Sequence, residues 1–130
     1  MERILTITRQ CDPGGPIVLR VDGELDHHTA PDFSEAVAEV AFGPGLDVII
    51  DLSALEYCDS TGITVLIRAY YRAEAAGSTL GIAGLNPDLL RVFQVTGLHQ
   101  LFTLHPTVEQ ALDHLRTQAA AEERARPAGH

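Results

Sequence analysis

The stretch Asp47-Val-Ile-Ile-Asp-Leu-Ser-Ala-Leu-Glu-Tyr-Cys-Asp-Ser-Thr-Gly-Ile-Thr-Val-Leu-Ile-Arg-Ala-Tyr70 decides the fold. Its first part, residues 48–52, is a nearly continuous apolar run, which is typical of a strand buried on both faces. Its last part repeats apolar residues at i, i+3, i+4 and i+7, which indicates an amphipathic helix. These residues are Ile63, Leu66, Ile67 and Tyr70. The pattern therefore predicts a buried strand followed by a helix.

Between the two patterns lies the tetrapeptide Asp59-Ser60-Thr61-Gly62. Asp, Ser and Thr side chains accept hydrogen bonds from amides that the first turn of a helix leaves unpaired. We therefore expect Ser60 at a helix N-terminus, just past the carboxyl end of a central strand, where ligands gather in open α/β sheets. The amides and the helix dipole would favour a phosphate there. From the pattern alone, the alternative is that Ser60 only caps the helix.

Outward from this stretch, strands and helices alternate. Residues 3–9 and 17–21 predict a hairpin around a turn at 12–16, and further strands are expected at 79–83 and 101–104. Helices are expected behind the N-caps Thr29, Asn86 and Thr107, and over residues 60–76. The predicted order is β-β-α-β-α-β-α-β-α. Because helix-linked strands pair in parallel, this order predicts an α/β fold with a single mixed, mostly parallel sheet and packed helices.

The chain has 130 residues, which fits one domain, expected here at 1–118. Residues 119–130 lack an apolar pattern, so we expect a disordered C-terminal tail. No apolar run reaches the length of a membrane span, and no secretory signal follows Met1. Cys11 and Cys58 lack metal-ligand spacing and are interpreted as reduced thiols. These features predict a cytoplasmic protein without a membrane partner.

The formal net charge is −9, and it is unevenly distributed. Residues 21–67 contain no Arg or Lys but ten Asp and Glu residues. Because nucleic-acid binding requires a basic surface, nucleic acid is not expected as a partner. A basic protein surface would be steered toward this acidic half. The alternative is that these acids are scattered and only increase solubility.

The motifs of common enzymes are absent. Ser60 is not in a Gly-x-Ser-x-Gly turn, and a chain without Lys has no GxxxxGK[ST] phosphate loop. Asp26, His27 and His28 are adjacent, so their side chains diverge and no metal site is predicted. We predict no enzymatic activity and no cofactor. A Ser at a helix N-terminus, flanked by carboxylates, instead suits a residue that another enzyme modifies.

Three blocks of sequence together resemble the STAS domain family, and more narrowly the bacterial anti-sigma factor antagonists, over residues 3 to 117. The blocks are Gly23-Glu-Leu-Asp-His-His-Thr-Ala30, Cys58-Asp-Ser-Thr-Gly62 and Leu90-Arg-Val-Phe-Gln-Val-Thr-Gly-Leu98. The Asp-Ser-Thr-Gly turn is the specific element. The resemblance implies that a kinase, which is also the anti-sigma factor, phosphorylates Ser60, with Thr61 a minor candidate. It also implies reversal by a PP2C-type phosphatase and release of a sigma factor by the unphosphorylated form.

The resemblance further implies a partner-binding surface. Its residues are Asp26, Asp59, Thr61, Gly62, Ile63 and Thr64, of which Asp26 and Asp59 are expected to recognise a basic patch. The family often has Gly-Leu-Gly after the phosphorylated residue, whereas this chain has Gly62-Ile63-Thr64, which bears on the choice of partner. The alternatives are a STAS module that is never phosphorylated, either a fixed scaffold or a transporter-associated unit, and a nucleotide-binding sensor.

Overall fold

The computed structural model describes residues 4–11 and 15–125. The strands are β1 (Leu5–Cys11), β2 (Ile17–Leu25), β3 (Asp47–Asp51), β4 (Leu55–Cys58), β5 (Thr79–Ala83) and β6 (Thr103–His105). The helices are α1 (Ala30–Ala38), α2 (Ser60–Ala75), α3 (Pro87–Thr96), the short 3₁₀ helix η1 (Leu98–Gln100) and α4 (Val108–Ala125).

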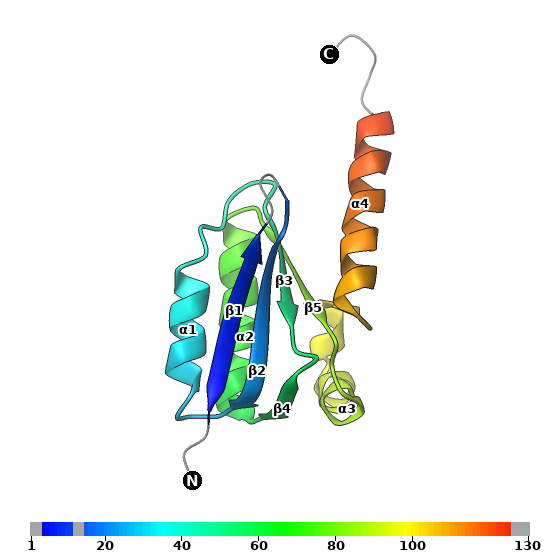
Figure 1. The fold of residues 1–130 in the computed structure, drawn as a ribbon. Helices are drawn as coiled ribbons and strands as arrows, with labels where there is room; N and C mark the ends of the chain where they lie inside the picture. The colour runs from blue at the N-terminus through cyan, green and yellow to red at the C-terminus, as the bar shows by residue number, and fades with distance from the viewer. Residues whose placement is uncertain (1–3, 12–14, 126–130) are drawn as a thin grey trace.

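A single mixed sheet has the strand order β1-β2-β3-β5-β6. β1 and β2 form an antiparallel hairpin, and the other pairs are parallel. Figure 1 shows α1 and α2 on one side of the sheet and α4 on the other, with α3 beside the end of β5. The predicted fold class, a mixed α/β sheet with packed helices, is confirmed. Part of the predicted turn, residues 12–14, lies outside the described residues.

The core has one large and one small cluster, separated by the sheet. The large one joins the sheet to α1, α2 and α3, and includes the fully buried Phe33, Leu66 and Phe93. The small one lies under α4. Its buried members are Val18, Ile49, Ala83 and Ala111. Because residues of β3 belong to both clusters, the strand is buried on both faces, as its apolar run predicts.

β4 is absent from the predicted order. It pairs with the end of β2, and the register of this pairing shifts between Gly23 and Glu24. Gly23 has φ +115°, and a Cβ there would lie 2.2 Å from the carbonyl oxygen of Ile4, so only glycine fits. The irregularity lets β2 pair first with β3 and then with β4. Only Leu55 of β4 is fully buried, which is why the strand has no apolar signature.

One predicted cap and two predicted boundaries differ from the structure. Thr29 occupies the N-cap position of α1, but its side chain makes no capping hydrogen bond. The last strand is Thr103–His105 rather than 101–104. α4 continues to Ala125, so the predicted start of the tail at 119 falls inside a helix, and residues 126–130 lie outside the described part. None of the helices described is long and apolar enough to cross a membrane.

Unfolding is expected to become easier below about pH 6.5 because of a histidine pair that joins α4 to β6. The rings of His105 and His114 are 5.3 Å apart. Burial, and secondly the charge of His114, lower the pKa of His105 from 6.5. The folded state therefore binds fewer protons than the unfolded state, and the stability present above pH 6.5 is lost as the pH falls through the lowered value. His105→Gln should flatten the dependence of urea midpoints on pH. His114→Gln should flatten it partly, and an unchanged slope in both variants would contradict the assignment.

Candidate functional site

The first turn of α2 is capped by Asp59, not by Ser60. Asp59 Oδ1 accepts hydrogen bonds from the amides of Thr61 at 2.9 Å and Gly62 at 3.1 Å. Ser60 is the first helical residue and is exposed. Among the described residues, no hydrogen bond uses its hydroxyl. The alternative interpretation, in which Ser60 serves as the helix cap, is therefore wrong, and the hydroxyl is accessible for a reaction.

Close packing fixes the position of this turn. The Asp59 amide donates to the carbonyl oxygen of Leu25, at the end of β2, over 3.0 Å. Gly62 is buried, and a Cβ there would lie 2.6 Å from Leu25 Cγ and 2.9 Å from Cys58 Sγ. Gly62 is therefore required for the close approach of α2 to β2 and β4.

Gly62→Ala is expected to destabilise the domain and displace the first turn of α2. The added methyl group overlaps Leu25 and Cys58, and overpacking of this kind costs about 1–3 kcal/mol. Denaturant unfolding measures the loss. Thr61→Ala is the matched control, because Thr61 is exposed in the same turn and should change stability by less than about 0.5 kcal/mol. Equal stabilities for the two variants would show that the packing at Gly62 is unimportant.

Asp26 lies in the loop between β2 and α1, and is only 3% exposed. Its Oδ1 accepts from the amides of His28 at 2.8 Å and Thr29 at 3.1 Å. In return, Thr29 Oγ1 accepts from the Asp26 amide at 2.9 Å and donates to the carbonyl oxygen of Glu24 at 2.8 Å. Asp26 thus shapes the loop, and it is buried although the resemblance implies that it belongs to a partner-binding surface.

The exposed part of the site is a small polar surface. Thr61 and Thr64 are exposed beside Ser60, and Ile63 is half-buried. Thr64 Oγ1 donates to the carbonyl oxygen of Ser60 over 2.9 Å, so its hydroxyl turns back onto the helix.

Burial, and secondly the charge of Asp59, raise the pKa of Cys58 to about 12. The Cys58 thiol therefore stays protonated at neutral pH and is a poor nucleophile.

α1 is held beside α2 by a residue that the sequence did not single out. Arg72 donates to the carbonyl oxygens of Val37 and Ala38, both over 3.1 Å, at the end of α1. Its guanidinium also lies 5.4 Å from the centre of the Phe42 ring. A cation at the C-terminus of a helix is electrostatically favourable. The exposed acidic residues of α1 are thereby fixed next to α2; they are Asp32 and Glu35.

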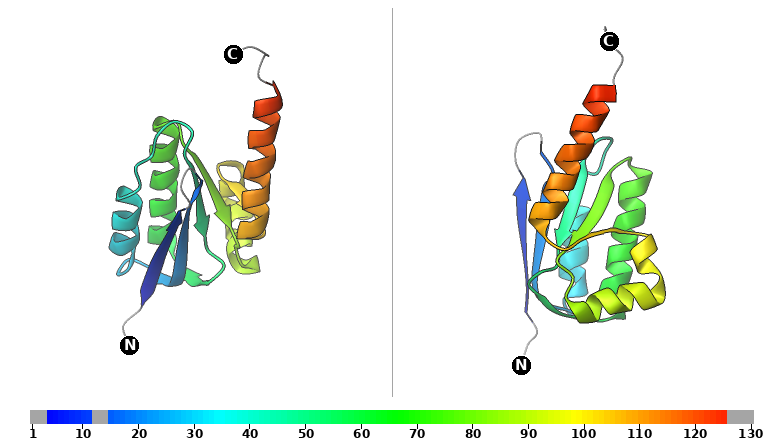
Figure 2. Two further views of the ribbon diagram at one scale, coloured as in Figure 1. Left: turned by 45° about the horizontal axis from the view of Figure 1, so that its top comes forward. Right: turned by 90° about the vertical axis from the view of Figure 1, so that its right-hand side faces the viewer.

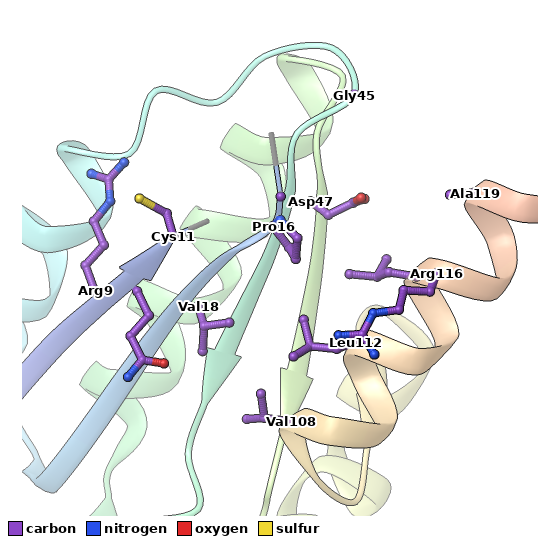
Figure 3. A pocket seen from close by; sticks show the side chains of 13 residues that line it. Arg9, Cys11, Pro16, Val18, Gly45, Asp47, Val108, Leu112, Arg116 and Ala119 are labelled. Atoms are coloured by element: carbon purple, nitrogen blue, oxygen red, sulfur yellow. The ribbon is translucent and has the colours of Figure 1, made fainter. Parts of the chain in front are cut away.

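A cleft of about 880 Å³ lies elsewhere, between α4 and the β1–β2 hairpin (Figure 3). Val18, Val108 and Leu112 line its apolar part, and its charged lining residues are Arg9, Asp47 and Arg116. None of its lining residues belongs to the Ser60 turn. Within the described residues, no group of three or more His, Cys, Asp or Glu side chains is arranged to hold a metal ion.

Comparison with known proteins agrees with this geometry. The model of the STAS domain matches residues 7–111. The chain belongs to the STAS domain family. An anti-sigma-F factor antagonist of Mycobacterium tuberculosis, RsfB, is 32% identical over 114 residues, which cover 86% of this chain and 90% of the relative. The structure of an anti-sigma factor antagonist from Mycobacterium paratuberculosis superposes with a TM-score of 0.76 at 34% identity, covering 87% of this chain and 95% of the other.

The anti-sigma factor antagonist SpoIIAA is a further structural relative. Its unphosphorylated form superposes with a TM-score of 0.65 at 26% identity, covering 86% of this chain and 97% of SpoIIAA. The phosphorylated form of SpoIIAA from Bacillus, at 23% identity, shares the fold with a TM-score of 0.67, covering 85% of this chain and 99% of the other. The resemblance inferred from the three sequence blocks is confirmed. The relatives are named for a regulatory role and not for an enzymatic reaction.

Proposed function

We propose that this STAS domain is an anti-sigma factor antagonist that is switched by phosphorylation of Ser60. The unphosphorylated form binds an anti-sigma factor and so frees a sigma factor in the cytoplasm. The anti-sigma factor is also the serine kinase that modifies Ser60, and a PP2C-type phosphatase removes the phosphate. The chain itself is a substrate and a binding partner, not an enzyme.

One observation carries the proposal: the Ser60 hydroxyl is exposed and is not required for the helix cap. Asp59 already accepts from the amides of Thr61 and Gly62, so the fold does not depend on the Ser60 side chain. Phosphoryl transfer needs an accessible hydroxyl that is aligned with the γ-phosphate of ATP. Ser60 Oγ would bond to phosphorus as ADP leaves, with its proton passing to a base on the kinase. The phosphorylated form of SpoIIAA supports the same chemistry in a relative.

Ser60→Ala is expected to abolish phosphorylation and to leave the fold intact. Intact mass after incubation with the anti-sigma factor kinase and Mg-ATP measures the first effect, and circular dichroism measures the second. Because no described hydrogen bond uses the hydroxyl, the stability should change by less than about 0.5 kcal/mol. Thr61→Ala is the control and should still gain one phosphate. Full phosphorylation of Ser60→Ala would place the acceptor elsewhere, whereas no phosphorylation of the unaltered chain by any candidate kinase would favour the scaffold alternative.

A further inference from the structure

β1 forms one edge of the sheet, and within the described residues only β2 pairs with it. Its seven residues, Leu-Thr-Ile-Thr-Arg-Gln-Cys, include three with high β-propensity and only one charge. Proteins commonly protect such edges with proline, inward charges, bulges or very short strands. β1 has none of these features and carries a single edge charge, Arg9, and Figure 1 shows it along the outer side of the sheet. The outer edge of β1 is therefore competent to pair with another strand.

The hydrogen bonding to β2 defines which groups point outward. The amide of Glu24 donates to the carbonyl oxygen of Ile4 over 3.2 Å. The even-numbered residues of this strand therefore direct their N–H and C=O groups toward β2. By the same alternation, Leu5, Ile7 and Arg9 direct their N–H and C=O groups away from β2. A second strand can then pair only in a register that matches odd-numbered residues with odd-numbered residues.

We propose that two copies of this chain associate through antiparallel pairing of β1 with β1, which joins their sheets into one. Pairing over the whole strand sets Thr8 opposite Thr8 of the second copy, on the two-fold axis. Ile7 then exchanges hydrogen bonds with Arg9 of the second copy, and Leu5 with Cys11. The next allowed registers differ from this one by two residues. A shift in one direction sets the two Arg9 residues directly opposite each other, and a shift in the other direction shortens the pairing. Like charges directly opposite are unfavourable, so the first register is selected.

Charge complementarity supports a second copy as the partner. Leu5 and Ile7 pack toward the core cluster that contains residues of α1, so Arg9, two residues on, lies on the same side of the strand. Opposite Ile7 of the second copy, Arg9 is brought toward that copy's α1. The exposed residues of α1 include two acids, Asp32 and Glu35, and no base. In each copy, β1 thus carries the positive charge of Arg9, and the neighbouring α1 carries the negative charges of Asp32 and Glu35.

The other face of β1 offers compatible contacts. Thr6, Thr8 and Gln10 lie opposite Asp22, Arg20 and Val18 of β2, on the side of α4, and all three are exposed. In the proposed register, Thr8 pairs with Thr8, and Thr6 pairs with Gln10 of the second copy. Threonine pairs across strands are favourable. Because all three side chains are uncharged, the pairing removes no charge from water on this face. The pairing uses no residue of the Ser60 turn, so it does not depend on phosphorylation of Ser60.

Single-cysteine cross-linking tests both the pairing and its register. In a Cys11→Ser background, Thr8→Cys should form a disulfide-linked dimer on mild oxidation, because opposite Cβ atoms in a non-hydrogen-bonded pair are about 4.5–5.5 Å apart. Thr6→Cys is the matched control. Two copies of residue 6 would be four residues apart along the strand, about 13 Å, and should not cross-link. A mixture of Thr6→Cys and Gln10→Cys chains should give the mixed dimer.

Sedimentation equilibrium over a concentration series supplies the second measurement. The unaltered chain should show a monomer–dimer equilibrium, and Thr8→Lys should weaken it by at least about tenfold by placing two ammonium groups opposite each other. Ser60→Ala should leave it unchanged. A monomer at every concentration, or cross-linking at positions 6 and 8 at equal rates, would overturn the proposal. Circular dichroism of each variant confirms that the exposed substitutions leave the fold intact.

Discussion

Phosphorylation of Ser60 is expected to weaken binding of the anti-sigma factor by more than about 100-fold. The phosphate adds about −1.5 to −2 charges and three acceptor oxygens where the partner meets a small hydroxyl. A like-charge contact at an interface costs several kcal/mol, and about 3 kcal/mol already corresponds to more than 100-fold in affinity. Titration calorimetry of the Ser60 and phospho-Ser60 forms measures the difference. Ser60→Asp should reproduce only part of it, because it brings a single charge on a shorter side chain.

The domain itself should change little on phosphorylation. The amides of Thr61 and Gly62 are already bound to Asp59 Oδ1, so they are not available to the phosphate unless it displaces the cap. The helix dipole still favours an anion there by about 0.3–1 kcal/mol, while the Asp59 carboxylate repels it. These opposing effects act on an exposed side chain and should nearly cancel.

Amide chemical shifts distinguish a local effect from a conformational one. We expect changes confined to the first turn of α2, the adjoining end of β4 and the loop after β2. Phospho-Ser60 in an Asp59→Asn background provides a control, since it retains an acceptor at the cap and removes the neighbouring charge. Shift changes that spread through β5 and α4 would mean that phosphorylation acts through a change of fold, and the proposed direct effect on the partner would be wrong.

The sequence predicted the elements with strong periodicity. The apolar run of β3, the stripe of α2 and the caps Asn86 and Thr107 all have local signals, and the structure confirms them. β4 was missed because its pairing depends on the irregularity at Gly23, which is a tertiary feature. A short strand with one buried residue shows no period of its own.

The sequence predicted where the site lies in the chain, but not its hydrogen bonds or the burial of its side chains. The tetrapeptide placed Ser60 at a helix N-terminus correctly, although the strand before it is β4, which pairs with β2, and not the central strand β3. Three successive residues that can all act as caps do not reveal which one does. Asp59 takes that role because its amide is tied to Leu25, at the end of a strand far away in the sequence. Likewise, the burial of Asp26 follows from its reciprocal hydrogen bonds with Thr29 and not from its own residue type. Both outcomes depend on contacts between elements.

Association with the anti-sigma factor is expected to slow by about tenfold or more as the ionic strength rises from about 0.01 M to 0.15 M. Residues 21–67 carry ten acids and no Arg or Lys, and this part of the chain includes α1 and the start of α2. Over this range the Debye length shortens from about 30 Å to about 8 Å, so the long-range attraction of a basic partner surface is screened. Stopped-flow fluorescence measures the association rate constant directly.

The exposed acids of α1, and not Asp26, should account for most of this dependence. Asp32→Asn and Glu35→Gln remove charge from exposed positions and should flatten the plot of association rate against ionic strength, with little change in the dissociation rate. Asp26 is 3% exposed and shapes the loop, so Asp26→Asn should act mainly on stability and dissociation. Glu109→Gln on α4 is the control of equal charge change, exposed outside the acidic segment, and should leave the slope nearly unaltered. If Glu109→Gln and Glu35→Gln flatten the slope equally, the attraction depends on net charge alone and the surface of α1 has no special part in it.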